Sequence, residues 1–157
     1  MLLNKEKIKI SIVGLGYVGL PLAVEFSKKF TVTGFDLNEN RIDELNNGYD
    51  RTNELSGRKL KSLKRIKFVA HENHLKDSNI YIVTVPTPVD NNNVPDLKPL
   101  ILASKTIARY LGKNNLVIYE STVYPGCTDD ICVPILEEHS GKKINVDFFC
   151  GYSPERI

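Results

Sequence analysis

Short apolar runs and amphipathic segments alternate along the whole chain. Ile8, Ile10 and Ile12 alternate with polar residues, a period of two that predicts a half-buried strand. The run at residues 80–85 is nearly continuous and rich in β-branched residues, which is typical of a parallel strand buried on both faces. Six strands are predicted in this way, at residues 8–13, 30–35, 66–69, 80–85, 116–119 and 146–150. Apolar positions three or four apart predict five helices. They lie from about Gly19 to about residue 29 and at residues 38–47, 55–65, 97–111 and 128–139.

This alternation predicts an α/β fold, a doubly wound parallel sheet that is Rossmann-like and forms a single domain over residues 1–157. A chain of 157 residues is long enough to bury a core without disulfides. Right-handed crossovers bring the carboxyl ends of parallel strands to one edge of the sheet. The polar turns after Val85, Tyr119 and Cys150 should therefore gather at this edge, where ligands bind in open α/β sheets.

Composition narrows the classes of partner. Apolar residues make up 41% and charged residues 25% of the chain, as in ordinary globular domains. A net charge of +2 gives no reason to expect a nucleic-acid partner. No signal peptide or membrane span is apparent, and the three cysteines have no metal-binding spacing. We expect a cytoplasmic chain with reduced thiols and without a metal, membrane or nucleic-acid partner.

The first strand runs into a glycine turn. Gly14, Gly16 and Gly19 match G-x-G-x-x-G, and each glycine has its own task. The first permits a tight turn, the second lets the backbone approach a pyrophosphate, and the third lets the helix pack close to the strand. The N-terminus of that helix adds free N–H groups that favour an anion.

An acid follows the second strand at the expected distance. Asp36 lies 36 − 14 = 22 positions after Gly14, close to the roughly 20 that separate the turn from a ribose-binding carboxylate. A carboxylate there accepts bonds from the ribose hydroxyls and repels a 2′-phosphate, so NAD is favoured over NADP as the cofactor. Arg41 either contacts the adenosine side of the cofactor or is a solvated helix residue.

Four motifs resemble a known family. VGLGYVGLPLA from Val13, TVPTPVD from Thr84, ESTVYPG from Glu120 and GYSPERI from Gly151 look like the N-terminal domain of the UDP-sugar 6-dehydrogenases. The sequences of these motifs are most similar to those of the branch that acts on UDP-N-acetylhexosamines, such as the UDP-N-acetylgalactosamine dehydrogenases of capsule and O-antigen synthesis. The resemblance implies oxidation of the sugar C6 alcohol to a carboxylate by two hydride transfers to NAD, through a thiohemiacetal and a thioester on a cysteine.

The resemblance also implies roles for individual cofactor-binding residues. Tyr17 and Val18 complete the pyrophosphate turn with its three glycines, while Asp36 binds the ribose and Arg41 lies on the adenosine side. The Thr-Pro motif lines the cofactor cleft with Val85, Pro86 and Thr87.

Catalytic roles follow from the same resemblance. Ser121 and Thr122 lie where the family places the nicotinamide and a catalytic water near C6. Glu155 matches the glutamate that activates or positions water for thioester hydrolysis, a role that suits a carboxylate able to accept a proton. We therefore take Glu155 and Thr122 as the candidate catalytic residues.

The family's nucleophilic cysteine has no counterpart in this chain. Cys127, Cys132 and Cys150 have no adjacent base or basic surroundings, so we interpret them as structural. The middle helix and the UDP-binding C-terminal domain are also absent, so residues 1–157 are expected to be the NAD-binding domain of a longer, homo-oligomeric enzyme acting on a UDP-sugar. Alone, this domain should bind NAD without completing the oxidation. Two alternatives stay open: the cofactor domain of another NAD-dependent dehydrogenase of hydroxy compounds, and a non-catalytic nucleotide-binding module.

Overall fold

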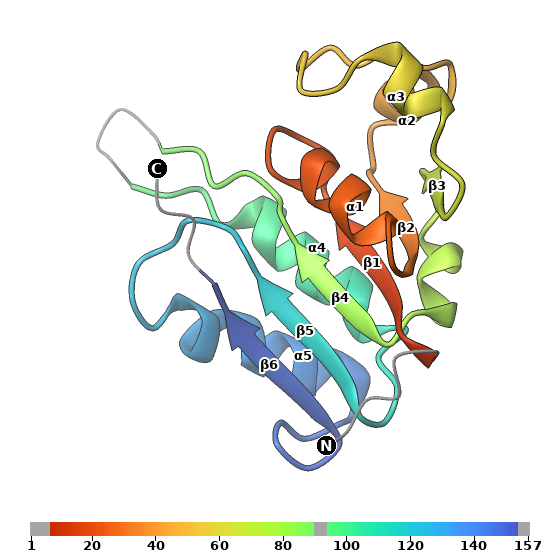
Figure 1. The fold of residues 1–157 in the computed structure, drawn as a ribbon. Helices are drawn as coiled ribbons and strands as arrows, with labels where there is room; N and C mark the ends of the chain where they lie inside the picture. Colours follow the sequence, from red (N-terminus) through yellow and green to blue (C-terminus); the bar gives the residue numbers. More distant parts are fainter. Residues whose placement is uncertain (1–6, 90–93, 154–157) are drawn as a thin grey trace.

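One parallel sheet organises the chain in the computed structural model, which describes residues 7–89 and 94–153. Its six strands have the order β3-β2-β1-β4-β5-β6, and their carboxyl ends point to the same side (Figure 1). The strands are β1 (Lys9–Val13), β2 (Thr31–Phe35), β3 (Ile66–Val69), β4 (Ile80–Val83), β5 (Asn115–Tyr119) and β6 (Phe148–Tyr152). The sheet grows outward from β1 in one direction and from β4 in the other, so the switch point where ligands bind lies between these two strands. The predicted doubly wound parallel sheet is confirmed.

Helices cover both faces of this sheet. The α-helices are α1 (Gly19–Ser27), α2 (Glu39–Asn46), α3 (Gly57–Lys61), α4 (Lys98–Ala108) and α5 (Val133–Ser140). A 3-10 helix, η2 (Glu72–Asp77), precedes β4, and a π-helical turn, η3 (Thr128–Cys132), leads into α5. Figure 1 shows α1 on one face and both α4 and α5 on the other. None of the helices within the described ranges is long and apolar enough to cross a membrane.

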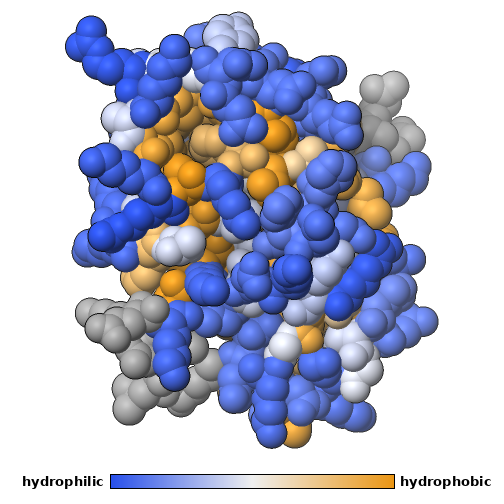
Figure 2. Space-filling model, turned by 90° about the vertical axis from the view of Figure 1, so that its right-hand side faces the viewer, coloured by the Kyte–Doolittle hydropathy of each residue, from blue (hydrophilic) through white to orange (hydrophobic). Residues whose placement is uncertain are grey.

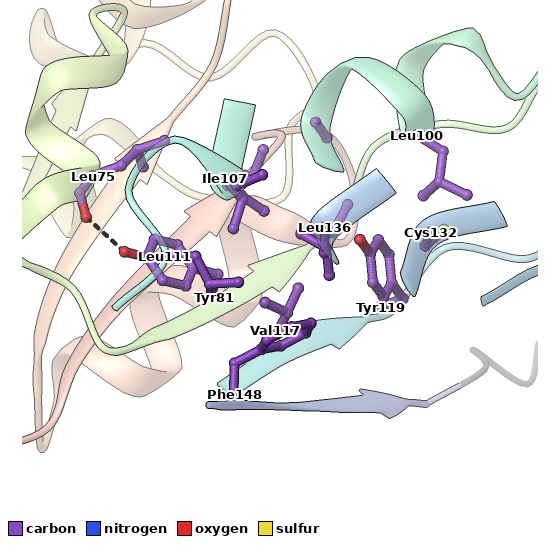
Figure 3. Close-up of a cluster of buried hydrophobic side chains, with 14 of the residues drawn as sticks. Leu75, Tyr81, Leu100, Ile107, Leu111, Val117, Tyr119, Cys132, Leu136 and Phe148 are labelled. Carbon is purple, nitrogen blue, oxygen red and sulfur yellow. Dashed lines mark hydrogen bonds between the residues drawn. The ribbon is translucent and has the colours of Figure 1, made fainter. Parts of the chain in front are cut away.

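The sheet separates two hydrophobic cores. Alternating residues of β5 show why: Val117 and Tyr119 are buried toward α4 and α5, whereas Leu116 and Ile118 face the α1 side and are half-buried. The core beneath α4 and α5 includes Tyr81, whose hydroxyl donates toward the Leu75 carbonyl at 3.1 Å (Figure 3). The same hydroxyl lies 3.0 Å from the Ser78 carbonyl.

The second core lies against α1, α2 and α3. In Figure 2 apolar atoms show between polar side chains over part of one side of the molecule. The partly buried residues at the edge of this core are Ile8, Leu22, Phe26, Phe30, Leu55, Leu63, Ile66, Ala70, Leu116 and Ile118.

Several predicted boundaries were wrong by a few residues. The helix predicted at residues 55–65 is only the short α3, which Ser56 caps by accepting the Lys59 N–H at 3.3 Å. The predicted strand at residues 80–85 ends at Val83, and the last strand is displaced from residues 146–150 to Phe148–Tyr152. The helix predicted from residue 97 begins at Lys98 and ends at Ala108.

Candidate functional site

The glycine turn connects β1 to α1 at the switch point, and its three glycines meet three different surroundings. Gly14 has φ +99°, and a Cβ there would lie 3.0 Å from the Thr84 carbonyl oxygen. A Cβ on Gly19 would lie 1.9 Å from the Gly14 carbonyl oxygen, whereas one on Gly16 would meet no atom of the described chain within 4 Å. The first and third glycines are thus required by the protein's own packing. The second leaves its backbone open to a ligand, which is what a pyrophosphate needs.

Residues around the glycines fix the shape of the turn. The Thr84 hydroxyl at the end of β4 donates to the Gly14 carbonyl at 2.7 Å. Tyr17 is 70% exposed, and Val18 is half-buried where α1 begins. Sequence reasoning quoted Thr84 as the first residue of the TVPTPVD motif but gave it no role, because nothing in the sequence shows that its hydroxyl reaches the glycine turn.

Asp36 stands directly beside this turn, as the spacing predicted. Its Oδ2 accepts the Leu15 N–H at 2.8 Å and its Oδ1 accepts the Asn38 N–H at 2.9 Å. Two backbone bonds orient the carboxylate and still leave lone pairs on both oxygens, since an ionised carboxylate has about four acceptor sites. The half-buried Asp36 can therefore accept further hydrogen bonds from a diol.

An apolar cavity of about 360 Å³ opens next to Asp36. It lies between the ends of β1, β2 and β4 and the first turns of α4. Its lining consists of Val13, Gly14, Phe35, Asp36, Leu37, Val85, Pro86, Lys98, Pro99, Leu102, Ala103 and Thr106. A mostly apolar cavity with one carboxylate at its side suits a purine base joined to a ribose. Sequence reasoning named Val85 and Pro86 but missed the α4 residues, because the amphipathic pattern of a helix gives no sign of which of its residues border a cleft.

The loops after β4 and β5 are tied together at the same edge. The Ser121 hydroxyl donates to the Val85 carbonyl at 2.7 Å, and the Thr87 hydroxyl donates to the Thr122 carbonyl at 2.6 Å. Ser121 is buried, whereas Thr122 is exposed. The structure thus brings Thr87, Ser121 and Thr122 together, as the topology predicted.

The loop after β5 and the end of β6 border a second hollow, of about 570 Å³. Its lining includes Tyr124, Gly126, Asp129, Gly151 and Tyr152. The Tyr152 hydroxyl donates to the Val123 carbonyl at 3.2 Å, which joins the two segments. The predicted catalytic residue Glu155 lies outside the described residues.

Arg41 is not a solvated helix residue. Its side chain is 5% exposed, and its Nη2 lies 2.8 Å from Oδ1 of Asp50. Its Nε donates to the Leu15 carbonyl at 2.9 Å, in the middle of the glycine turn. The described residues offer its buried Nη1 no hydrogen-bond partner. The structure therefore places Arg41 against the turn, and a direct contact with adenosine stays a prediction.

The cysteines lack the properties of a nucleophile. Cys127 and Cys132 are buried and Cys150 is half-buried. Burial raises the pKa of both Cys132 and Cys150 to about 12, and it also raises the pKa of Cys127. A reactive cysteine needs a lowered pKa, so this environment agrees with the structural interpretation. Within residues 7–89 and 94–153, no cluster of three or more His, Cys, Asp or Glu side chains could hold a metal ion.

The sheet order, the glycine turn and the acid after β2 define a dinucleotide-binding domain of the Rossmann type. Comparison with known families agrees with this class and narrows it. Residues 8–157 match the model of the UDP-glucose/GDP-mannose dehydrogenase family, NAD binding domain. The chain belongs to this family and is its NAD-binding domain, which confirms the resemblance inferred from the four motifs.

Individual relatives match almost the whole of this chain. The chain is 55% identical to a UDP-N-acetyl-D-glucosamine 6-dehydrogenase of Pseudomonas aeruginosa over 152 residues. These aligned residues cover 97% of this chain and 36% of that protein. It is 53% identical to protein CapL of Staphylococcus aureus, over 94% of this chain and 35% of that protein. The chain therefore spans little more than a third of the length of these curated relatives.

Solved structures share the fold. A UDP-D-ManNAc dehydrogenase of Pyrococcus horikoshii superposes with a TM-score of 0.89 at 36% identity, over 96% of this chain and 37% of that one. A ternary complex of GDP-mannose dehydrogenase from Pseudomonas aeruginosa gives a TM-score of 0.87 at 30% identity, over 94% of this chain and 36% of that one.

Proposed function

We propose that this chain is the cofactor domain of an enzyme that oxidises the C6 hydroxyl of a UDP-N-acetylhexosamine to the uronate, with two hydride transfers to NAD. The observation that carries the cofactor part is the open space at Gly16 beside the oriented carboxylate of Asp36. The 55% identity to a UDP-N-acetyl-D-glucosamine 6-dehydrogenase supports the substrate class. Family membership favours this function over the other dehydrogenases and the non-catalytic module that the sequence left open.

The site residues divide the work of binding along the sheet edge. The apolar cavity between β2 and α4 would take the adenine, and Asp36 would accept the hydroxyls of its ribose. The N–H groups of the glycine turn and the start of α1 would bind the pyrophosphate. The nicotinamide half would then reach Thr87, Ser121 and Thr122 on the loops after β4 and β5. NAD supplies the hydride acceptor when it is bound.

The remaining catalytic roles rest on the resemblance. Thr122, whose side chain is exposed at the sheet edge, would hold a water near C6. Glu155 would accept a proton from the water that attacks the thioester. The cysteine that carries the thioester would come from outside these residues, because all three thiols here have raised pKa values. We expect the full enzyme to be cytoplasmic and homo-oligomeric, and its product to enter surface polysaccharide synthesis.

Calorimetric titration of the chain with NAD and with NADP tests the cofactor part. We expect NAD to bind at least about tenfold more tightly, a difference of about 1.4 kcal/mol. In Asp36→Asn, the lost negative charge should weaken NAD binding and reduce the preference over NADP by about tenfold. Asp43→Asn makes the same charge change at an exposed position on α2 and should leave both affinities unchanged.

Three results would count against the proposal. Equal or tighter binding of NADP by the unmodified chain would contradict the role of Asp36. A folded chain that binds neither nucleotide would contradict autonomous cofactor binding. Four-electron oxidation of a UDP-sugar by these 157 residues alone would contradict the external nucleophile.

A further inference from the structure

The peptide between Leu15 and Gly16 is held from behind the glycine turn. The Leu15 carbonyl accepts the Arg41 Nε–H at 2.9 Å. In a planar trans peptide, the N–H points opposite to the carbonyl. A carbonyl that faces the buried guanidinium therefore directs the Gly16 N–H the other way, toward the side on which Gly16 is exposed. The neighbouring Leu15 N–H is fixed by Asp36 at 2.8 Å.

Arg41 is itself held by Asp50, which follows α2 in the chain. The Nη2 of Arg41 lies 2.8 Å from Oδ1 of Asp50, and the two side chains are 5% and 0% exposed. Asp50 also accepts the Thr52 N–H at 3.1 Å and hydroxyl at 2.7 Å and the Leu55 N–H at 3.0 Å. This carboxylate is anchored by its own loop and can fix the guanidinium in one orientation.

The charge state of Asp50 suits this task. Burial alone would raise its pKa, but the hydrogen bonds from Thr52, Arg41 and the Leu55 N–H outweigh burial and hold the pKa below its usual value. Asp50 is therefore ionised at neutral pH and neutralises Arg41. An arginine whose charge is paired in this way is poorly suited to recruit a 2′-phosphate, which agrees with the expected preference for NAD.

We propose that Asp50, acting through Arg41, is a positioning residue that aims the Gly16 N–H at the pyrophosphate of the cofactor. This inference rests on the proposed function, in which the glycine turn binds NAD. Asp50 need not contact the cofactor, because its effect passes through one guanidinium and one peptide. If the pair were only a structural ion pair, it would stabilise the loop after α2 without altering the turn.

Two conservative variants separate these possibilities. Asp50→Asn keeps the size and an acceptor but removes the charge. Arg41→Lys keeps the charge but loses the planar fork that joins Asp50 to the Leu15 carbonyl. Glu72→Gln is the matched control, because it breaks the exposed Arg109–Glu72 ion pair at 2.6 Å on the 3-10 helix before β4.

Each variant of the 157-residue chain is measured in two ways, at a temperature well below its midpoint of thermal unfolding. Calorimetry should show NAD bound about tenfold more weakly by Asp50→Asn and by Arg41→Lys, as expected for the loss of one charge-assisted hydrogen bond. Without cofactor, NMR should show faster hydrogen exchange at the Leu15 amide, which is bonded to Asp36, and a shifted amide resonance at Gly16, with Ile82 in β4 unchanged. Glu72→Gln should match the unmodified chain in both.

The outcomes are distinct. A folded Asp50→Asn or Arg41→Lys chain with unchanged NAD affinity, unchanged exchange at Leu15 and an unshifted Gly16 amide resonance overturns the inference, even if its stability has fallen. If the single variants do not fold, the double variant Arg41→Met/Asp50→Leu removes both buried charges and should fold. We expect it to bind NAD about tenfold more weakly. An unchanged NAD affinity of this double variant would overturn the inference. If the unmodified chain binds no NAD, the proposed function fails, while amide exchange still tests whether the pair holds the turn.

Discussion

The three glycines of the turn show how the same residue type serves folding at some positions and binding at another. Gly14 and Gly19 are constrained by protein atoms within 3.0 Å of the position that a Cβ would take. Gly16 has no such neighbour in the described chain, so packing there does not require its lack of a side chain, which leaves room for the proposed pyrophosphate. The motif thus combines two packing requirements with one proposed binding requirement, and substitutions separate them.

Gly19→Ala should therefore lower stability, whereas Gly16→Ala should weaken NAD binding without lowering stability. In Gly19→Ala, the new Cβ meets a backbone oxygen at 1.9 Å, which a side-chain movement cannot relieve. We expect a loss of about 3 kcal/mol in the free energy of unfolding. In Gly16→Ala, that free energy should be unchanged or rise by about 0.5 kcal/mol, while NAD binding falls at least about tenfold because the methyl occupies the pyrophosphate's space.

Urea unfolding and calorimetric titration of both variants check this contrast. A Gly16→Ala chain that binds NAD normally would show that the pyrophosphate lies elsewhere. A Gly19→Ala chain of normal stability would show that the turn can open without cost.

Residue spacing predicted some contacts of the site and could not predict others. Asp36 was found from its distance to Gly14, because the fold fixes both the length of α1 and the position of the next strand end. The pairing of Arg41 with Asp50 was not, because the loop after α2 places Asp50 by hydrogen bonds from Thr52 and Leu55. A polar connecting segment has no periodic pattern in its sequence, so the conformation of the loop and the position of Asp50 could not be predicted.

At the scale of elements, buried polar groups join neighbouring segments in addition to apolar packing. The Tyr81 hydroxyl on β4 lies 3.1 Å from the Leu75 carbonyl and 3.0 Å from the Ser78 carbonyl. It also lies 3.2 Å from the Tyr110 carbonyl, just after α4. One hydroxyl thus connects the central strand with η2 and with the end of α4, and Figure 3 shows it inside the apolar core.

Tyr81→Phe should lower the free energy of unfolding by about 1–2 kcal/mol, because it leaves buried carbonyls without this donor. The ring and its packing remain, so the loss reports the hydroxyl alone. Tyr49→Phe is the matched control, since Tyr49 is exposed and its change should stay within about 0.5 kcal/mol. Equal urea midpoints for the two variants would show that Tyr81 contributes only through its ring.

Element order was easier to predict than element ends. All six strands were found because period-two and continuous apolar runs mark them clearly. The helix predicted at residues 55–65 failed because three leucines among basic residues suggested an amphipathic face, while the structure keeps only the short α3 and leaves Leu55 and Leu63 in irregular segments. The π-helical turn before α5 also has no period of its own to read.

At the scale of the whole molecule, the three thiols are protected from reagents by the core in or against which they lie. This protection therefore depends on the folded state of the chain. Cys127 and Cys132 belong to the core beneath α4 and α5, and Cys150 packs against it. A reagent that needs thiolate meets two obstacles there. One is burial, and the other is the raised pKa that burial produces.

Alkylation by iodoacetamide at pH 8 should therefore be slow in the folded chain and fast in urea. With a pKa of about 12, about one in ten thousand Cys132 or Cys150 thiols is ionised at this pH, against about a quarter for an ordinary thiol with a pKa near 8.5. We expect native labelling of Cys132 and Cys150 to be at least about a thousandfold slower than their labelling in the unfolded chain, and labelling of Cys127 to be slowed as well. Mass spectrometry of timed samples would follow each cysteine separately.

This labelling also tests the division of labour in the proposed enzyme. Rapid modification of one cysteine in the folded chain, with a rate that levels off near neutral pH, would reveal a thiolate of low pKa. That cysteine would then be a candidate nucleophile within these 157 residues, contrary to the proposal. Uniform protection that disappears only as the sheet unfolds would agree with the proposal that the cysteine chemistry belongs to another part of the enzyme.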